Sequence, residues 1–364
     1  MKVAVPTADL AEALRKVLSV VTSRSTLPVL GNVLLSARSG ELALSTTDLE
    51  VSITTAMAAE VSREGDATLM GRKLGQLVGT LSGDTVTIEI DENMASSISC
   101  GSARFRLLGL NAAEFPKEAP FTAQRELSFP GGEFTKVLRK IAYAVSADQT
   151  RYVLNGILLS VKEGVFTAVA TDGRRLALVE KNLEEGYSGA TGDAILPIKV
   201  VKELQRLLTG DEDVIIKVSD TRASFSVGKT VLTSKLVEGT YPNYRQVIPS
   251  AFSNSVSMPR EQLIRVLDRV SVVVSDSGAA VKCALGENAM TLSASSVEIG
   301  EASEPLEVAY QGSPVTISFN PQFLRDPLTN LEADDITMKF NDEFKPVVVL
   351  GDEGFLCVIM PMRS

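Results

Sequence analysis

A short helix signature occurs three times in this chain at nearly constant spacing. In each copy an apolar residue and a proline are followed, four and eight residues after the proline, by large apolar side chains. The copies are Val5-Pro6 with Leu10 and Leu14, Phe129-Pro130 with Phe134 and Leu138, and Met258-Pro259 with Leu263 and Leu267. Proline suits the start of a helix, and apolar residues at this spacing form one buried stripe. The prolines lie 124 and 129 residues apart, so the sequence predicts three domains of one design.

Each third of the chain continues with the same order of elements. Alternating apolar and polar segments, separated by glycine-containing turns, predict antiparallel hairpins. A second helix, an acidic turn and further strands complete the unit, with the second helices expected at 72–80, 198–208 and 321–331. Two helices on an antiparallel sheet, repeated three times, make an α+β fold.

Proline-containing segments separate the repeats and predict linkers at 113–125 and 239–254. We therefore expect domains at 1–120, 126–248 and 254–364. The third copy of the second helix contains Pro327, which we expect to kink or shorten that helix.

Composition excludes several classes of protein. The chain has no histidine, the commonest general base and metal ligand, and its cysteines, Cys100, Cys283 and Cys357, are too scattered for a disulfide framework or a zinc site. No apolar run approaches the roughly 20 residues of a membrane span, and the N-terminus lacks a signal-peptide core. We expect a cytoplasmic protein without a cofactor or metal.

Charge is distributed unevenly between the predicted helices and the rest of the chain. The six helical stretches (9–21, 72–80, 133–145, 198–208, 260–273 and 321–331) contain 14 Lys and Arg but only seven Asp and Glu, although the whole chain has a net charge of −9. One interpretation is that Lys and Arg are simply good helix formers on solvated faces. The other is a basic face that contacts phosphates without reading bases, since aromatic residues are few.

Six motifs in order along the chain give a more specific indication. They are Ser25–Asn32 (STLPVLGN), Arg151–Gly156 (RYVLNG), Ala170–Leu176 (ATDGRRL), Thr233–Gly239 (TSKLVEG), Tyr241–Tyr244 (YPNY) and Met360–Arg363 (MPMR). With these motifs the chain resembles, over its whole length, the bacterial sliding clamps, the β subunits of DNA polymerase III.

The resemblance implies a head-to-tail homodimer whose six domains form a closed ring around duplex DNA, with the helices inside and the sheets outside. The partners it implies are duplex DNA of any sequence, a replicative polymerase, clamp-loader subunits and repair proteins that attach through short peptides, and a second copy of the chain. No membrane and no catalysis are implied.

The resemblance also assigns residues to three surfaces. Those matching DNA contacts are Arg24, Arg72, Lys73, Gln149, Arg151, Tyr152 and Lys199. Those matching a hydrophobic pocket for partner peptides, between the second and third domains, are Leu154, Thr171, Gly173, Arg174, Arg175, Leu176, Pro242, Val247, Asn320, Phe323, Val358, Met360, Pro361 and Met362. Adaptable methionines suit a pocket that accepts many peptides. From sequence alone, Leu154, Leu176 and Val247 are typical of a core.

The dimer seam implied by the family pairs a basic and aromatic strand of the first domain with an apolar and acidic region of the third. The matching residues are Arg104, Phe105, Arg106 and Leu107, and Val272, Val273, Glu298 and Glu301. Such a pairing is electrostatically complementary. The chain departs from the family at Arg174, often His in relatives, and at Gln246, often Arg; the segment before Arg151 is also one residue shorter.

Two other functions remain as alternatives. An enzyme would use Asp48 and Asp172, or Lys199, but both aspartates follow a threonine at equivalent places in successive repeats. This placement predicts that they form turns rather than a catalytic pair. The second alternative is a repeat scaffold that binds peptides without encircling DNA, against which the basic helices count.

Overall fold

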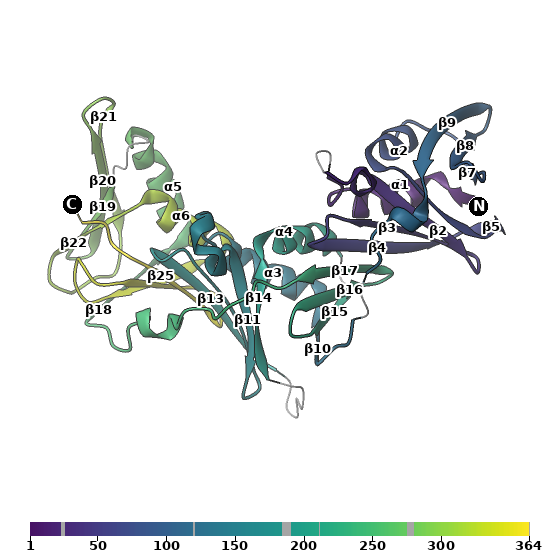
Figure 1. The fold of residues 1–364 in the computed structure, drawn as a ribbon. Coiled ribbons are helices and arrows are strands. Elements are labelled where there is room, and N and C mark those ends of the chain that lie inside the picture. The colour runs from purple at the N-terminus through teal and green to yellow at the C-terminus, as the bar shows by residue number, and fades with distance from the viewer. Residues whose placement is uncertain (23–25, 119–120, 184–190, 211, 275–279, 364) are drawn as a thin grey trace. The chain divides into compact units, whose positions relative to one another are not determined.

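A short strand ending in proline precedes the first helix of each repeat. The computed structural model describes residues 1–22, 26–118, 121–183, 191–210, 212–274 and 280–363 (Figure 1). The strands are β1 (Lys2–Pro6), β10 (Arg125–Pro130) and β18 (Asn254–Pro259), and the helices are α1 (Thr7–Val17), α3 (Gly131–Ala142) and α5 (Arg260–Val270). The helices are confirmed, but the strands were missed because they share their last residues with the helix signature. Pro6 and Pro259 are N-cap residues and not the first helical residues.

The second helices are α2 (Gly71–Val78), α4 (Ile198–Leu207) and α6 (Pro321–Asn330). Pro327 is buried inside α6, which has ten residues, as α4 does. Pro327 therefore does not shorten this helix relative to α4, and the other expected effect, a kink, stays a prediction. Its nitrogen cannot donate to the carbonyl group of Phe323, but its own carbonyl oxygen accepts a bond from the Leu331 nitrogen at 3.2 Å.

The apolar stripes of the helix signature are buried, as expected. Leu10, Phe134 and Leu263 have no exposed surface, and the Phe134 ring stacks on Phe129 and Phe225 with centroid distances of 5.6 and 6.4 Å. Burial of such stripes against a sheet is the main source of stability for helices of this length. The described residues contain no helix that is long and apolar enough to cross a membrane.

The chain forms two compact units, each built on antiparallel sheets, which confirms the α+β class. The first unit comprises residues 1–134 and 202–236, and the second 135–201 and 237–364. The first contains a 13-stranded sheet in the order β10-β15-β16-β17-β4-β3-β2-β6-β9-β8-β7-β1-β5. Its remaining strands are β2 (Asn32–Arg38), β3 (Glu41–Thr47), β4 (Val51–Ala58), β5 (Glu60–Arg63), β6 (Gly65–Met70), β7 (Thr85–Ile90), β8 (Ala95–Cys100), β9 (Ala103–Leu110), β15 (Asp213–Val218), β16 (Arg222–Val227) and β17 (Thr230–Lys235).

The second unit contains an eight-stranded sheet, β14-β11-β12-β13-β25-β24-β23-β18, and a four-stranded sheet, β21-β20-β19-β22. Its remaining strands are β11 (Gly156–Lys162), β12 (Val165–Thr171), β13 (Arg175–Asn182), β14 (Gly192–Pro197), β19 (Val281–Gly286), β20 (Ala289–Ser296), β21 (Gly300–Glu307), β22 (Val315–Phe319), β23 (Asp335–Phe340), β24 (Val347–Leu350) and β25 (Phe355–Ile359). The short 3-10 helices of the chain are η1 (Pro28–Gly31), η2 (Ala112–Glu114), η3 (Gln149–Asn155), η4 (Tyr244–Val247) and η5 (Ser271–Val273).

Strand pairing crosses both predicted linkers. β4 of the first third pairs with β17 of the second, and β13 of the second pairs with β25 of the third. The linker residues also pack on their neighbours: Phe115 is buried with Val29 and Leu30, and Tyr241 is buried in a larger apolar cluster. The sheets therefore run continuously between repeats. The exact domain limits at 120, 248 and 254 stay a prediction.

Candidate functional site

A Thr-Asp turn at the end of β12 positions much of the candidate peptide pocket. The Thr171 hydroxyl donates to the Arg175 carbonyl oxygen at 2.7 Å and accepts from the Gly173 nitrogen at 3.1 Å. Asp172 Oδ1 accepts from the nitrogens of Arg174 and Arg175 at 2.8 and 3.0 Å. Gly173 has φ +85°, a conformation that favours glycine.

The first repeat makes the same turn after β3. The Thr47 hydroxyl donates to the Val51 carbonyl oxygen at 3.1 Å, and Asp48 Oδ1 accepts from the nitrogens of Glu50 and Val51 at 3.0 and 2.8 Å. The prediction that Asp48 and Asp172 form turns is confirmed. Their carboxylates hold local backbone, which is the usual role of aspartate in such loops.

Arg175 lies at the centre of a largely buried charged cluster in the second unit. Its Nε donates to Asp172 Oδ2 at 3.2 Å, its Nη2 to the Tyr143 carbonyl oxygen, and its Nη1 to Asp326. The guanidinium also lies over the rings of Phe323 and Tyr143, 4.5 and 5.3 Å from their centroids. The Arg175 side chain is only 10% exposed. One cation thus joins the Thr-Asp turn to α6 and to Tyr143, the residue that follows α3, through charge-assisted bonds and ring stacking.

Two neutral groups lie beside this cluster. Burial raises the pKa of the Tyr143 hydroxyl well above its usual value and raises the pKa of the Cys357 thiol to about 12. Neither group ionises near neutral pH, so Arg175 remains balanced by Asp172 and Asp326.

Replacing Arg175 with alanine is expected to lower the free energy of unfolding by about 3–5 kcal/mol, because it leaves two partly buried carboxylates without their cation. Arg175→Lys should recover only part of the loss, since an ammonium group lacks the planar fork and the stacking surface. Urea unfolding of both variants measures the difference. The matched control is Arg245, an exposed arginine of the same unit that pairs with Glu180 at 2.7 Å. Arg245→Ala should lower the free energy of unfolding by less than about 1 kcal/mol. Equal losses for Arg175→Ala and Arg245→Ala would contradict a special role for the cluster.

The apolar members of the candidate pocket fall into a buried floor and an exposed rim. Leu154, Leu176 and Val358 belong to one buried apolar cluster that also includes Tyr241. Leu176 and Val358 are direct partners across β13 and β25. Val247 and Met360, in contrast, are 48% and 39% exposed. The interpretation of Val247 as a core residue is therefore wrong, because η4 holds it on the surface after the buried Tyr241.

Hydrogen bonds that involve the backbone hold several of the remaining pocket residues in place. The Met360 nitrogen donates to the Arg174 carbonyl oxygen at 2.9 Å, and the Met362 nitrogen to that of Ser318 at 2.7 Å. The Thr171 nitrogen donates to the Tyr241 hydroxyl at 3.1 Å. Asn320 caps α6 by accepting from the Gln322 nitrogen at 2.9 Å. Pro361 is half-buried between the two methionines, and Pro242 is exposed next to Tyr241.

The candidate DNA contacts lie on both units and are exposed where described. Arg72 and Lys73 occupy the first turn of α2 in the first unit, whereas Lys199 is the second residue of α4 in the second. Gln149, Arg151 and Tyr152 lie in η3, which also carries Leu154. Arg24 lies outside the described residues. Arg151 is not a free cation, since its Nε is 3.8 Å from Asp148 Oδ2 and its Nη1 is 3.5 Å from the Asp172 carbonyl oxygen.

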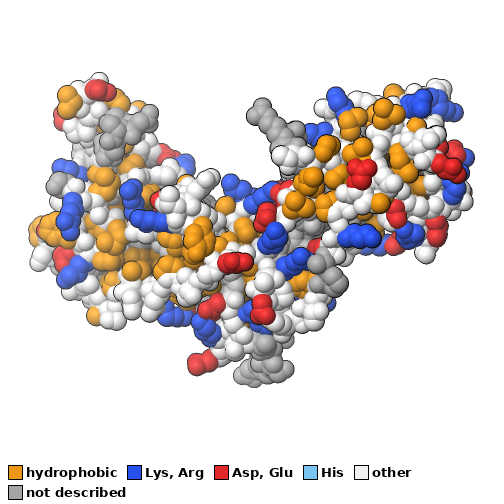
Figure 2. All heavy atoms as spheres, in the orientation of Figure 1, with side chains coloured by type: hydrophobic (Ala, Val, Ile, Leu, Met, Phe, Trp, Pro, Cys, Tyr) orange, Lys and Arg blue, Asp and Glu red, His pale blue; other side chains and the backbone are white. Residues whose placement is uncertain are grey.

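Acidic side chains neutralise many of the helical cations. Lys136 and Arg139 on α3 both pair with Glu332, at 2.9 and 3.0 Å, and hydrogen bonding to Lys136 is the main reason that the pKa of Glu332 is lowered. Lys140 pairs with Asp352 in a nearly buried contact. On the face drawn in Figure 2, Lys and Arg side chains lie beside Asp and Glu and do not form one uninterrupted patch. The charge surplus of the helices therefore overstates the number of cations available to a ligand.

Two sheet edges carry the candidate dimer contacts. β9 pairs with β8 over residues 103–108 and with β6 only at Gly109 and Leu110, which leaves one edge of residues 103–108 unpaired among the described strands. Arg104, Phe105 and Arg106 are exposed on this segment, and Leu107 is half-buried. Sequence reasoning missed Leu108, which is more exposed than Phe105.

The acidic edge belongs to the second unit. β21 is the outermost strand of the four-stranded sheet and carries Glu301, while Glu298 lies in the exposed turn before it. Val272 is largely exposed and Val273 half-buried in η5. The same turn exposes Val297 and Ile299, two apolar residues that sequence reasoning also missed. Their signal was an apolar pair in a turn next to Gly300.

Comparisons with known proteins agree along the whole chain. Residues 1–119, 128–243 and 245–363 match the N-terminal, central and C-terminal domain models of the DNA polymerase III beta subunit. The beta sliding clamp of Caulobacter vibrioides is 34% identical over 372 residues, covering all of both chains, and that of Chlamydia muridarum is 31% identical, covering 100% of this chain and 99% of the relative. A crystal structure of the Pseudomonas aeruginosa sliding clamp bound to griselimycin superposes with a TM-score of 0.96, at 30% identity and complete coverage of both chains.

Proposed function

Because the chain belongs to the DNA polymerase III beta subunit family, the sliding clamps, we propose that two copies close head to tail into a ring of six domains around duplex DNA. The match of three successive domain models carries this proposal. In such a ring, topology holds the DNA, so the protein can slide without strong affinity for any sequence. It acts in the cytoplasm and catalyses no covalent chemistry. It raises the effective concentration of a polymerase at the primer end.

The seam of the ring forms between the two sheet edges described above. The unpaired edge of β9 brings Arg104, Phe105 and Arg106, and the edge at β21 brings Glu301 with Val272 and Val273 beside it. Addition of one strand edge to another supplies backbone bonds, and the opposite charges fix orientation. Both strand edges are paired in a closed ring, so neither stays available for aggregation with other chains.

Among the described residues, the DNA contacts come from helix ends and from η3, and they go to phosphates. Arg24, Arg72, Lys73, Gln149, Arg151, Tyr152 and Lys199 make these contacts. Arg72 and Lys73 are the best-supported DNA contacts, because both are exposed and have no ion-pair partner among the described residues.

The double variant Arg72→Ala/Lys73→Ala is expected to flatten the salt dependence of duplex binding. Each lost phosphate contact should reduce the slope of log K against log salt by about 0.9. Fluorescence anisotropy of a labelled duplex at several salt concentrations measures the slope. A matched control is Lys229→Ala/Lys235→Ala, which removes two cations that pair with Glu41 and Glu50 near the ends of β3, β4 and β17. An unchanged slope for the α2 variant would exclude these residues from the DNA surface.

The partner pocket is formed by the floor of Leu154, Leu176 and Val358 and the rim of Val247 and Met360. Short apolar segments of a polymerase, of clamp-loader subunits and of repair proteins dock there. The remaining members are Thr171, Gly173, Arg174, Arg175, Pro242, Asn320, Phe323, Pro361 and Met362. Exposed apolar residues over a buried apolar floor support this assignment. We further propose that griselimycin, bound by the Pseudomonas aeruginosa clamp, occupies this same pocket here.

A further inference from the structure

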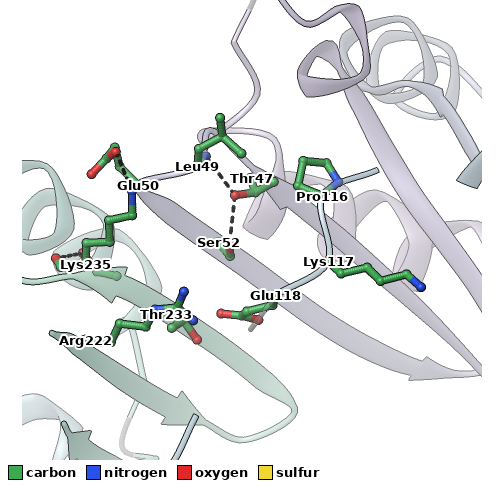
Figure 3. A pocket seen from close by; sticks show the side chains of 11 residues that line it. Thr47, Leu49, Glu50, Ser52, Pro116, Lys117, Glu118, Arg222, Thr233 and Lys235 are labelled. Atoms are coloured by element: carbon green, nitrogen blue, oxygen red, sulfur yellow. Dashed lines mark hydrogen bonds and ion pairs between the residues drawn. The ribbon is translucent and has the colours of Figure 1, made fainter. Parts of the chain in front are cut away.

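A groove on the first unit lies where the first two repeats meet. It has a volume of about 360 Å³ and is lined by the turn Thr47–Ser52, the connector Pro116–Glu118, and the end of β17 at Thr233–Lys235 (Figure 3). Arg222 of β16 completes the wall. None of these residues belongs to a surface assigned above.

The strand registers show that this groove is the repeat counterpart of the partner pocket. Ser52 is opposite Thr233 across β4 and β17, as Leu176 is opposite Val358 across β13 and β25. β4 and β13 each follow a Thr-Asp turn with the same hydrogen bonds.

The flanking residues correspond as well. Lys235 occupies the place of Met360, two residues after Thr233 as Met360 is two after Val358. Leu49, with φ +76°, occupies the place of Gly173. Pro116 and Pro242 each follow a buried aromatic residue.

The two grooves differ in chemistry at the matched positions. Serine, threonine and lysine replace the leucine, valine and methionine of the partner pocket. The polar groups bond to each other, since the Ser52 hydroxyl donates to Thr47 Oγ1 at 2.9 Å and Lys235 Nζ pairs with Glu50 Oε1 at 3.0 Å (Figure 3). An apolar side chain entering this groove would remove these groups from water without gaining an apolar floor.

We propose that Ser52, Thr233 and Lys235 are specificity-determining residues that exclude apolar partner segments from this groove. Each chain therefore offers such segments one site, although its repeats build two grooves of the same design. This inference rests on the proposed partner pocket. Leu49 assists the exclusion, because its side chain lines the groove at the position where the pocket has only the hydrogen of Gly173.

Transplanting the pocket residues tests the inference. Isothermal titration with griselimycin should give one molecule per chain for the unaltered protein and two for Leu49→Gly/Ser52→Leu/Thr233→Val/Lys235→Met. The conservative variant Ser52→Thr/Thr233→Ser/Lys235→Arg should stay at one. Adding Val247→Asp/Met360→Asp to the transplanted variant should leave one molecule, bound in the new site. A folded transplanted variant that still binds only one molecule, lost on adding Val247→Asp/Met360→Asp, would overturn the inference.

A second arm does not depend on the folding of the transplanted chain. Met360→Lys copies the charge of Lys235 onto the exposed rim of the pocket, and it should weaken griselimycin binding by at least about tenfold, whereas Met360→Leu should stay within about threefold. Unchanged affinity for Met360→Lys would contradict exclusion by this lysine. Failure of the proposed pocket is recognised separately: the variant that carries only Val247→Asp/Met360→Asp, without the transplanted residues, would then still bind one molecule of griselimycin.

Discussion

Replacing Phe105 and Val273 with alanine is expected to raise the dissociation constant of the dimer by roughly a hundredfold. A buried aromatic residue at the centre of an interface commonly contributes 2 kcal/mol or more, and each factor of ten corresponds to about 1.4 kcal/mol. Phe105 is 37% exposed on an unpaired strand edge, and Val273 is half-buried beside the exposed Val272. Alanine at both positions removes apolar area from the two sides of the seam while leaving the charged residues in place.

Light scattering across a dilution series measures this effect. The unaltered protein should keep a mass of about 78 kDa, twice the chain mass of 38.9 kDa, and the variant should fall toward the chain mass at much higher concentration. A matched control is Val231→Ala/Phe344→Ala, which truncates two exposed apolar residues outside both edges; Val231 is as exposed as Phe105. If the control and the seam variant dissociated alike, the seam would be elsewhere.

Negative charge on the pocket rim is expected to reduce griselimycin binding by an even larger factor than the seam variant reduces dimer affinity. Val247→Asp together with Met360→Asp should abolish detectable binding of griselimycin, because two carboxylates would be desolvated above an apolar floor. Both side chains are more than a third exposed, so the substitutions should leave the fold intact. Isothermal titration measures the binding, and thermal unfolding verifies the fold.

The control for the rim variant is Ile215→Asp with Val231→Asp, on β15 and β17, the two strands that flank β16 in the first unit. Ile215 and Val231 are 38% and 37% exposed, close to the 39% of Met360, but they lie outside the pocket. This control should bind griselimycin with unchanged affinity. Retained binding in the rim variant would show that griselimycin occupies another site.

Local patterns in the sequence were enough to predict the helices and turns. The stripes at Leu10, Phe134 and Leu263 are buried as expected, and both Thr-Asp turns form. The pairing of β4 with β17 was not predictable in this way, because Ser52 and Thr233 are far apart in the sequence and carry no local signal for each other. Continuity of the sheets between repeats is a tertiary property, and so is the packing of the linkers.

The candidate surfaces show the same division. Leu154 and Leu176 have the pattern of core residues and are buried, whereas Val247 has that pattern and is exposed. Composition also showed an excess of cations on the helices but could not show their partners. Glu332, which pairs with Lys136 and Arg139, is almost 200 residues away from them in the sequence. Interactions at such separation depend on the fold, so the sequence alone overestimated the available positive charge.

Retention on circular DNA tests the central claim, a ring that holds DNA by topology. The protein is assembled on a nicked plasmid with a clamp-loader complex and passed through a gel-filtration column at about 0.5 M salt, where phosphate contacts are largely screened. We expect it to stay with the circular plasmid and to be lost when a restriction enzyme linearises the DNA. Equal retention on both forms would show binding by contact, and loss from both would show that no closed ring forms.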